Sequence, residues 1–331
     1  MTEYRSVLVL GETEHGRLAS GSRELLGLGR TLANELGEEL KAFLVGAEAE
    51  SAAPDAIACG ADEVYIAHGP DLARYNSDVY TAAVTGVCQE VSPSIVLMGQ
   101  TSIGRDLAPR VASRLGASLS TDCVELRIDP GSKRLVQVRP VYGGNAVATV
   151  VSKAYPQIAT VRPRTAQAPE PDTSRTGKVT TVELGEIEAM VNVVDVVRET
   201  AEGVKIEDAA VVVGGGAGLR GPEDFDMIGE LAAVLGGAVG ATRQPCEDGW
   251  VSSSSQIGQT GKIIAPDLYL AIAISGAPQH MAGCLGSKFI VAVNTDPEAH
   301  IFKMSDFGIV ADYREAVPAL IRKCRELKSA G

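Results

Sequence analysis

The feature that most constrains the fold of this chain is a regular alternation of short apolar strands with helical segments. In the first 160 or so residues the strand-like runs are "SVLVL" (6–10), "LKAFLVG" (40–46), "EVYIA" (63–67) and "SIVLMG" (94–99). Helical patterns separate them over about 22–36, up to Gly60, from Ser77, and over about 104–115. Glycines 37 and 116 end two of these helices. Such alternation predicts a parallel, doubly wound sheet.

A second unit of the same kind begins near residue 205. Its predicted strands are 209–215, 238–242, 268–275, 289–294 and 308–312, and its predicted helices are 222–235, with Pro222 in the first turn, a short one from Pro278, and 314–328. We therefore expect an α/β chain of two domains, 1–200 and 205–331, each on a mostly parallel doubly wound sheet.

The end of the first domain departs from this pattern. The runs "CVELRID", "RLVQVRPVY" and "AVATVVS" are strand-like, and a "DPGSKR" turn rather than a helix joins the first two, which predicts antiparallel additions. The stretch 162–180 is rich in Pro, Thr and charge, so we expect a surface connection that builds no core.

Composition and charge exclude several classes of function. The net charge of −12 would repel a phosphate backbone, which argues against nucleic-acid binding. The opening "MTEYRSVLVLGE" lacks a basic n-region, and no apolar run reaches the roughly 18 residues of a membrane helix. We expect a cytoplasmic protein without membrane insertion.

The reactive side chains form no recognisable catalytic or metal-binding pattern. The six cysteines show no C-x-x-C spacing and no ligand-like spacing to any of the four histidines, which predicts no metal site and no disulfide framework. There is no G-x-S-x-G, no H-E-x-x-H and no Walker-type loop. The sequence indicates a cofactor site without bond-breaking residues.

A glycine-rich loop, "GGGAGLRG" (214–221), follows a predicted strand and precedes a helix, as a dinucleotide-binding fold requires. A glycine turn without a ligand would look the same. The next strand ends in Thr242-Arg243 rather than in an acidic residue. Arg243 could meet an NADP 2′-phosphate, face an electron-rich part of another cofactor, or lie in solvent.

Other strand ends are small and polar: Ser275-Gly276, Asn294 and Asp312. Ligands of open α/β sheets bind beyond these ends. Free amides of the turn at Ser275 and of "GQTG" (258–261) would suit the two phosphates of a pyrophosphate. His280 follows closely, and a structural and a reactive role both stay open for it.

The run 256–312, with its strand, S-G-A-x-Q-H, glycine and strand-Asn pattern, closely resembles the FAD-binding domain of electron-transfer flavoprotein alpha subunits. The resemblance extends upstream through "GPEDFDMIGELAAVLGGAVGATR" and, more loosely, to "TSIGRDLAPRVASRLGASLSTD" in the first domain. It implies that residues 205–331 form a Rossmann-like FAD-binding domain.

The resemblance also implies which residues bind the cofactor. The set is Thr242, Arg243, Ile257, Gly258, Gln259, Thr260, Gly261, Ser275, Gly276, Ala277, Pro278, Gln279, His280, Asn294 and Asp312. At the ring end, Arg243 would lie at the reactive edge of the isoalloxazine beside Thr242, with Thr260 near N5 and Gln259 near the ring or ribityl chain. His280 would point at the N1/O2 side. Residues 275–279 would wrap the pyrophosphate, with Asn294 on phosphate and Asp312 at the adenosine end.

The family resemblance further implies partners and a role. The chain would be the alpha subunit of a heterodimer, with its first domain against a beta subunit, and it would shuttle single electrons from flavin dehydrogenases such as the acyl-CoA dehydrogenases of fatty acid β-oxidation. It would be an electron carrier rather than a stand-alone enzyme. An electron-bifurcating complex, in which an FAD of the beta subunit takes hydride from NADH, is one alternative. An NADP-binding oxidoreductase is a weaker one.

One position departs from the family pattern and generates a prediction. Family members often carry arginine in the glycine loop, where this chain has Ala217. A nearby cation stabilises the negative charge of reduced or semiquinone flavin, so its absence predicts a somewhat lower flavin potential or weaker semiquinone stabilisation. We expect Ala217→Arg to raise the potential or stabilise the semiquinone in a redox titration against wild type. No change in either redox couple would contradict this.

Overall fold

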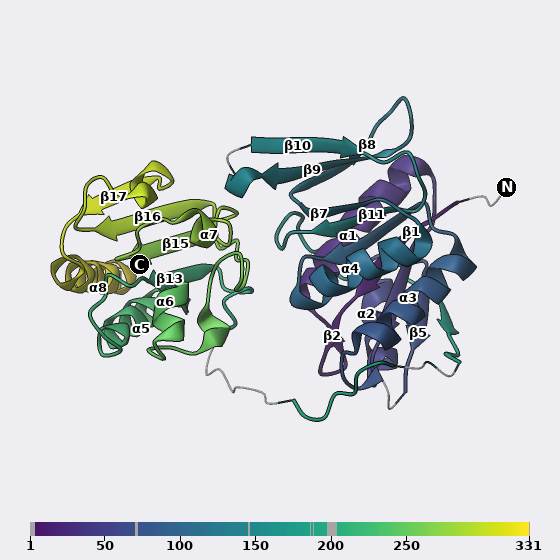
Figure 1. Cartoon of the computed structure of the whole chain (residues 1–331), viewed down its shortest axis with the longest axis horizontal. Helices are drawn as coiled ribbons and strands as arrows, with labels where there is room; N and C mark the ends of the chain where they lie inside the picture. Colours follow the sequence, from purple (N-terminus) through teal and green to yellow (C-terminus); the bar gives the residue numbers. More distant parts are fainter. Residues whose placement is uncertain are drawn as a thin grey trace. The chain divides into compact units, whose positions relative to one another are not determined.

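The computed structural model describes residues 4–69, 72–144, 146–185, 187, 189–196 and 204–330. The chain divides into two compact units, residues 1–196 and 197–331. The expected α/β class with two parallel-sheet domains is confirmed (Figure 1). Among the helices of the described ranges, none is both long and apolar enough to cross a lipid bilayer.

Unit 1 is built on a seven-stranded parallel sheet of order β12-β5-β4-β1-β6-β11-β7. Its strands are β1 (Val7–Gly11), β4 (Leu40–Val45), β5 (Glu63–Ala67), β6 (Ile95–Gly99), β7 (Leu119–Cys123), β11 (Gln157–Val161) and β12 (Lys178–Thr181). Its helices are α1 (Ser20–Leu36), α2 (Ala53–Ala58), α3 (Ser77–Val91) and α4 (Ser102–Leu115), with short 3-10 turns at Ala49–Ala52 (η1) and Tyr142–Gly144 (η3). A small hairpin joins β2 (Thr13–Glu14) to β3 (Arg17–Leu18).

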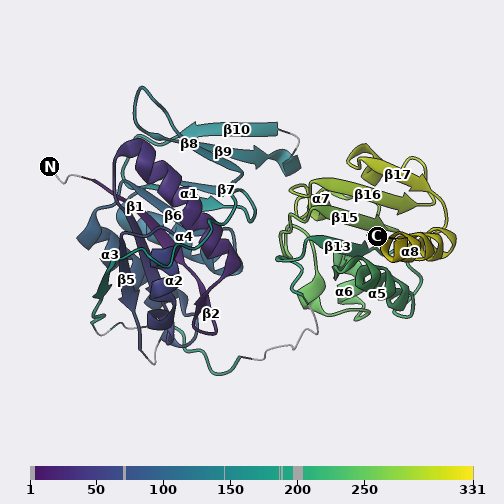
Figure 2. The same cartoon turned by 180° about the vertical axis from the view of Figure 1, so that it is seen from behind.

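Both faces of this sheet are covered, which is why its strands are continuously apolar. Alternate β1 residues point to opposite sides: Val7 and Val9 pack with α1 and α2, whereas Leu8 and Leu10 pack with α3 and α4. Figures 1 and 2 show these two helical layers from opposite sides.

The strand-like runs after residue 123 form the expected antiparallel addition, a separate three-stranded sheet of order β10-β9-β8. The strands are β8 (Glu125–Ile128), β9 (Leu135–Val141) and β10 (Ala146–Val151). Leu126, Ile128 and Leu135 anchor it in the core beneath α1, while Val147 and Val151 of β10 are exposed.

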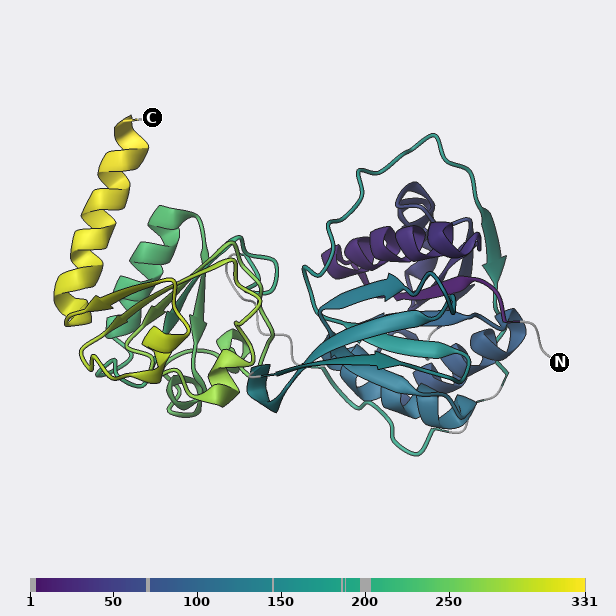
Figure 3. The ribbon, with the colours of Figure 1, turned by 90° about the horizontal axis from the view of Figure 1, so that it is seen from above.

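Five strands of unit 1 were not predicted, namely β2, β3, β7, β11 and β12, and one prediction was wrong in part. The run 162–180 does cross the surface as a long loop (Figure 3), but its last residues form β12, which pairs in parallel with β5 at the edge of the sheet. Two side-chain hydrogen bonds hold this edge strand in place: Lys178 and Thr180 both donate to the Glu63 carboxylate of β5. β7 and β11 also belong to the parallel sheet.

Unit 2 has a five-stranded parallel sheet of order β14-β13-β15-β16-β17, as expected. The strands are β13 (Val211–Gly215), β14 (Ala238–Ala241), β15 (Leu268–Ile272), β16 (Phe289–Asn294) and β17 (Phe307–Val310). The helices are α5 (Asp224–Leu235), α6 (Arg243–Glu247), α7 (Pro278–Met281) and α8 (Tyr313–Ala330), with 3-10 turns at Ser253–Ser255 (η4) and His300–Lys303 (η5). α5 and α8 pack on one face, and α7 lies on the other.

Two local predictions in unit 2 need correction. Pro222 precedes α5 rather than lying in its first turn, because the N–H groups of Asp224 and Phe225 bond the carbonyls three residues before them, which makes a tight turn ahead of the α-helix. The stretch after Thr242, expected to be a loop, forms the one-turn helix α6.

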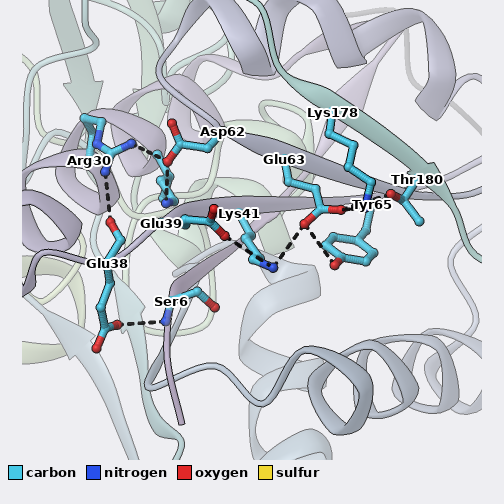
Figure 4. A network of polar contacts seen from close by, with 11 residues as sticks. Ser6, Arg30, Glu38, Glu39, Lys41, Asp62, Glu63, Tyr65, Lys178 and Thr180 are labelled. Atoms are coloured by element: carbon cyan, nitrogen blue, oxygen red, sulfur yellow. Dashed lines mark hydrogen bonds and ion pairs between the residues drawn. The ribbon is translucent and has the colours of Figure 1, made fainter. Parts of the chain in front are cut away.

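A polar network ties the sheet edge of unit 1 together (Figure 4). Glu63 accepts hydrogen bonds from Lys41 (3.0 Å), Lys178 (2.6 Å), Thr180 (3.0 Å) and the Tyr65 hydroxyl (3.1 Å). Burial would raise the pKa of this carboxyl, but the bonds from Lys178, Lys41 and Thr180 outweigh burial and lower its pKa to about 2. Glu63 therefore stays charged at every physiological pH.

Replacing Glu63 should destabilise unit 1. Its side chain is 10% exposed and that of Lys41 is 15% exposed, so Glu63→Gln leaves a largely buried ammonium with only the exposed carboxylate of Glu39, 3.7 Å away. We expect a loss of roughly 2–4 kcal/mol in the free energy of unfolding, measured by denaturant titration. Lys178, 71% exposed, is the matched control: Lys178→Gln should cost less than about 1 kcal/mol. Equal losses for both variants would contradict the assignment.

Candidate functional site

A pocket of about 630 Å³ lies beyond the carboxyl ends of the unit 2 strands. It forms where the strand order reverses, between the loop that follows β13 and the loop that follows β15. That is the position at which open α/β sheets bind ligands, and the volume lies within the range of small-molecule sites.

The structure brings most of the expected site residues together. Twelve of them line the pocket: Thr242, Arg243, Ile257, Gly258, Gln259, Thr260, Ser275, Ala277, Gln279, His280, Asn294 and Asp312. Gly276 and Pro278 line a shallow hollow beside it. Gly261 lines neither, and its N–H instead closes the 258–261 turn on the Gly258 carbonyl.

Twelve further residues line the pocket but are absent from the predicted site. They are Ala217, Gly218, Arg220, Gln244, Glu247, Gln256, Ala273, Ile274, Val293, Thr295, Ala311 and Tyr313. Two carried a usable signal. Glu247 stands four residues after Arg243, the spacing of a helical ion pair, and Arg220 is a cation within the glycine loop. The apolar lining residues cannot be distinguished from core residues in the sequence.

Gly216 and Gly218 of the glycine loop support a neighbouring loop and do not offer their own amides to a ligand. Gly216 N–H donates to the Ile272 carbonyl (3.0 Å) and Gly218 N–H to the Ala273 carbonyl (3.2 Å). A Cβ on Gly216 would collide with the backbone at Ala273. The glycines are needed because two backbones pack directly together, so this loop differs from a dinucleotide fingerprint, where such amides face the pyrophosphate.

The loop after β15 presents the free amides instead. Three consecutive carbonyls, those of Ile274, Ser275 and Gly276, accept hydrogen bonds from Asn294 Nδ2 (2.9 Å), Ile301 N (3.0 Å) and His300 Nδ1 (3.0 Å). In a trans peptide the next N–H points the opposite way. Within the described part of the chain, no protein acceptor takes the N–H groups of residues 275–277.

The 258–261 turn is docked on α7. Gln259 N–H donates to the Gln279 carbonyl at 2.7 Å, and Gly258 N–H donates to the Lys262 carbonyl at 3.1 Å. The Thr260 hydroxyl accepts from Gln256 Nε2 at 2.9 Å, which leaves its own proton to be donated elsewhere. The turn therefore offers a hydroxyl donor at the pocket wall.

Two arginines line the pocket, and their surroundings differ. Arg243 Nε donates to Glu247 Oε1 at 2.7 Å, with both side chains at least half exposed. Arg220 is exposed, and among the described residues its guanidinium has no carboxylate partner. Arg220 is thus a cation without a carboxylate partner beside the free amides, which favours an anionic group at this end of the pocket, whereas Asp312 places a carboxylate at another part of its lining.

His280 is buried and has a protein partner on each ring nitrogen. Nδ1 lies 3.1 Å from the Ile257 carbonyl, and Nε2 lies 2.8 Å from the hydroxyl of Tyr269. A carbonyl only accepts, so Nδ1 carries the proton and Nε2 accepts from Tyr269. Burial, opposed by the bond to Ile257, lowers the pKa of His280 to about 4, so the ring is neutral at pH 7. The geometry gives His280 a structural role, and the donor role toward flavin N1/O2 stays a prediction.

Comparison with known proteins agrees with this architecture. Residues 7–187 match a family described as "Electron transfer flavoprotein domain", and residues 205–285 match "Electron transfer flavoprotein FAD-binding domain". The chain is 41% identical over 331 residues to an electron transfer flavoprotein subunit alpha of Thermoanaerobacterium thermosaccharolyticum, covering 99% of this chain and 100% of that one.

Two further relatives are similar over their full lengths. An electron transfer flavoprotein subunit alpha of Bacillus subtilis is 41% identical, with 98% of each chain covered. Protein FixB of Clostridium saccharobutylicum is 40% identical, with 100% of this chain and 99% of that one covered. The chain belongs to the family of electron transfer flavoprotein alpha subunits and FixB proteins.

The buried His280 generates a prediction about pH and stability. Its pKa is about 4 in the folded state and near 6.5 in an unfolded chain, so between these values the unfolded state binds more protons. We expect the stability of unit 2 to fall by roughly 3 kcal/mol as the pH drops from 6.5 to 4. Fluorescence of Trp250, the single tryptophan, reports on the unfolding of unit 2.

The variant His280→Gln isolates this contribution, because only the slope of stability against pH is compared. The slope over pH 4–6.5 should be flatter in His280→Gln than in wild type. Identical slopes in wild type and His280→Gln would contradict a buried neutral histidine.

Proposed function

We propose that this chain is the alpha subunit of a heterodimeric electron-transfer flavoprotein that binds FAD in residues 205–331. It shuttles single electrons between flavin dehydrogenases, such as acyl-CoA dehydrogenases, and a downstream acceptor. It acts in the cytoplasm as an electron carrier rather than as a stand-alone enzyme. Family membership supports the assignment to electron-transfer flavoprotein alpha subunits, and the pocket of unit 2 supports FAD as the cofactor.

The observation that carries the proposal is the row of free amides at residues 275–277, of which Ser275 and Ala277 line the pocket and Gly276 lines the hollow beside it. Three N–H groups with no protein acceptor suit a pyrophosphate, and the unpaired guanidinium of Arg220 adds a positive charge on the same pocket. The pocket continues past Thr260 and Arg243 on one side and Asp312 on the other, so it has room for groups on both ends of a pyrophosphate. These features fit a flavin dinucleotide.

Each part of the pocket would then have a separate task. The amides of residues 275–277 hold the phosphates, the Asp312 carboxylate accepts hydrogen bonds from the adenosine end, and the Thr260 hydroxyl donates to the ring end. Bound FAD supplies a ring system that takes up and releases electrons. Arg243 would lower the energy of negative charge on that ring, and Glu247 moderates this effect because it neutralises the guanidinium.

The beta subunit is the expected partner of unit 1. The curated relatives are named as subunits, which supports an assembly with another chain. Unit 1 also exposes apolar side chains on its antiparallel sheet, with Tyr142 85% and Val147 62% accessible. Contact with a second chain would cover this surface.

The rivals are separated by different observations. An NADP-binding oxidoreductase needs free amides in the glycine loop and a free arginine at the end of the second strand. Here the amides of Gly216 and Gly218 are bonded to β15 and its loop, and Arg243 is paired with Glu247. An electron-bifurcating complex uses the same alpha subunit pocket, so the number of bound flavins must separate it from a simple shuttle.

The decisive experiment is the visible spectrum and flavin content of the chain purified together with its beta subunit. We expect a yellow complex that bleaches in two one-electron steps. One FAD per heterodimer identifies a simple shuttle, and two support the bifurcating arrangement. A colourless complex that binds NADPH would overturn the proposal.

A further inference from the structure

His300 lies outside the pocket but bonds the loop that forms its amide-rich wall. It begins the turn η5, is exposed, and donates from Nδ1 to the Gly276 carbonyl at 3.0 Å. The neighbouring Ile301 N–H holds the Ser275 carbonyl at the same distance. The segment after β16 therefore donates hydrogen bonds to two successive peptide groups of the loop.

These two hydrogen bonds matter because the backbone of Gly276 does not by itself fix the orientation of the peptide group that follows it. Its φ is +84°, a left-handed conformation, and glycine adopts it without the cost that other residues incur. A Cβ at this position would collide with the backbone of Ile301, so a stiffer residue does not fit. The orientation of the peptide joining Gly276 to Ala277 thus depends on a bond from outside the loop, and His300 supplies it.

The electrostatics show on which side of the loop an anion belongs. His300 shares a shallow hollow with Asp296 and Glu298, whose carboxylates would repel a phosphate. Ser275 and Ala277 of the same loop also line the main pocket, to which Arg220 contributes a cation. Because the Gly276 carbonyl points to His300, the N–H of Ala277 points away from it, toward this pocket.

We propose that His300 is a positioning residue for pyrophosphate binding, which orients the peptide between Gly276 and Ala277 so that the Ala277 N–H faces the phosphates. This rests on the proposed function, since the ligand is the pyrophosphate of FAD. No contact between His300 and the cofactor is required. Its contribution is to fix a donor that a flexible glycine would otherwise leave free to rotate.

The test compares three variants of the full chain, stripped of cofactor and titrated with FAD by fluorescence and with ADP by calorimetry. His300→Ala removes the bond and should weaken binding of both ligands roughly 3- to 10-fold. His300→Asn should recover most of the affinity, because the Asn amide Nδ2 can donate from nearly the same place as Nδ1. Lys303→Ala, three residues on in the same turn, removes a cation without touching the loop and should bind as wild type does.

Each outcome bears on a separate claim. Wild type that binds neither FAD nor ADP would overturn the proposed function itself. Normal FAD and ADP affinity in His300→Ala would overturn the role of His300 while leaving FAD binding intact. If His300→Asn weakens binding as much as His300→Ala does, the hydrogen bond to Gly276 is not what supports binding, and the proposed role of His300 is overturned. Equal weakening in Lys303→Ala would attribute the effect to general changes in this turn and would overturn that role as well. His300 is exposed, so the melting temperature of His300→Ala should match that of wild type, which the same samples check.

Discussion

The organisation of the candidate site depends on the packing of the loop after β15 between two other backbones. On one side, Gly216 and Gly218 donate their N–H groups to the carbonyls of Ile272 and Ala273. On the other, the segment from Asn294 to Ile301 takes the next three carbonyls. All the acceptors of the loop are used by the protein, so its donors are what remain for a ligand. An anion can supply the acceptors that these donors lack in the protein.

This arrangement changes the meaning of the glycine loop. In its sequence the G-x-G-x-x-G pattern is the same as that of a loop that cradles phosphate directly. In the structure the first two glycines allow close approach to the neighbouring loop, whose amides are the free ones. Gly216 and Gly218 therefore contribute to ligand binding indirectly, because they fix the loop whose amides can bind the ligand.

Buried polar groups stabilise both units, but by different means. In unit 1 the Glu63 carboxylate is kept charged by two lysines and ties the edge strand β12 to β5. In unit 2 the His280 ring is kept neutral and joins the segment at Ile257 to Tyr269 on β15. A buried ion pair and a buried neutral network each satisfy their hydrogen bonds, which is the condition for placing polar groups in a core.

Strand and helix periodicity is local, so the sequence alone predicts the two α/β units and the antiparallel addition. The convergence of strand ends on one edge of a sheet points to Thr242, Ser275 and Asn294, whereas other lining residues, such as Ile257 and Gln279, are predicted only through the family resemblance. The sequence did not predict β12, an edge strand in a Pro-rich run that bonds the distant Glu63. Nor did it determine the pairing of His280 with Tyr269 and Ile257, or the bond from His300 to Gly276. Those contacts join residues 11 to 24 positions apart, and only the packing of the sheet and its loops decides which donor meets which acceptor.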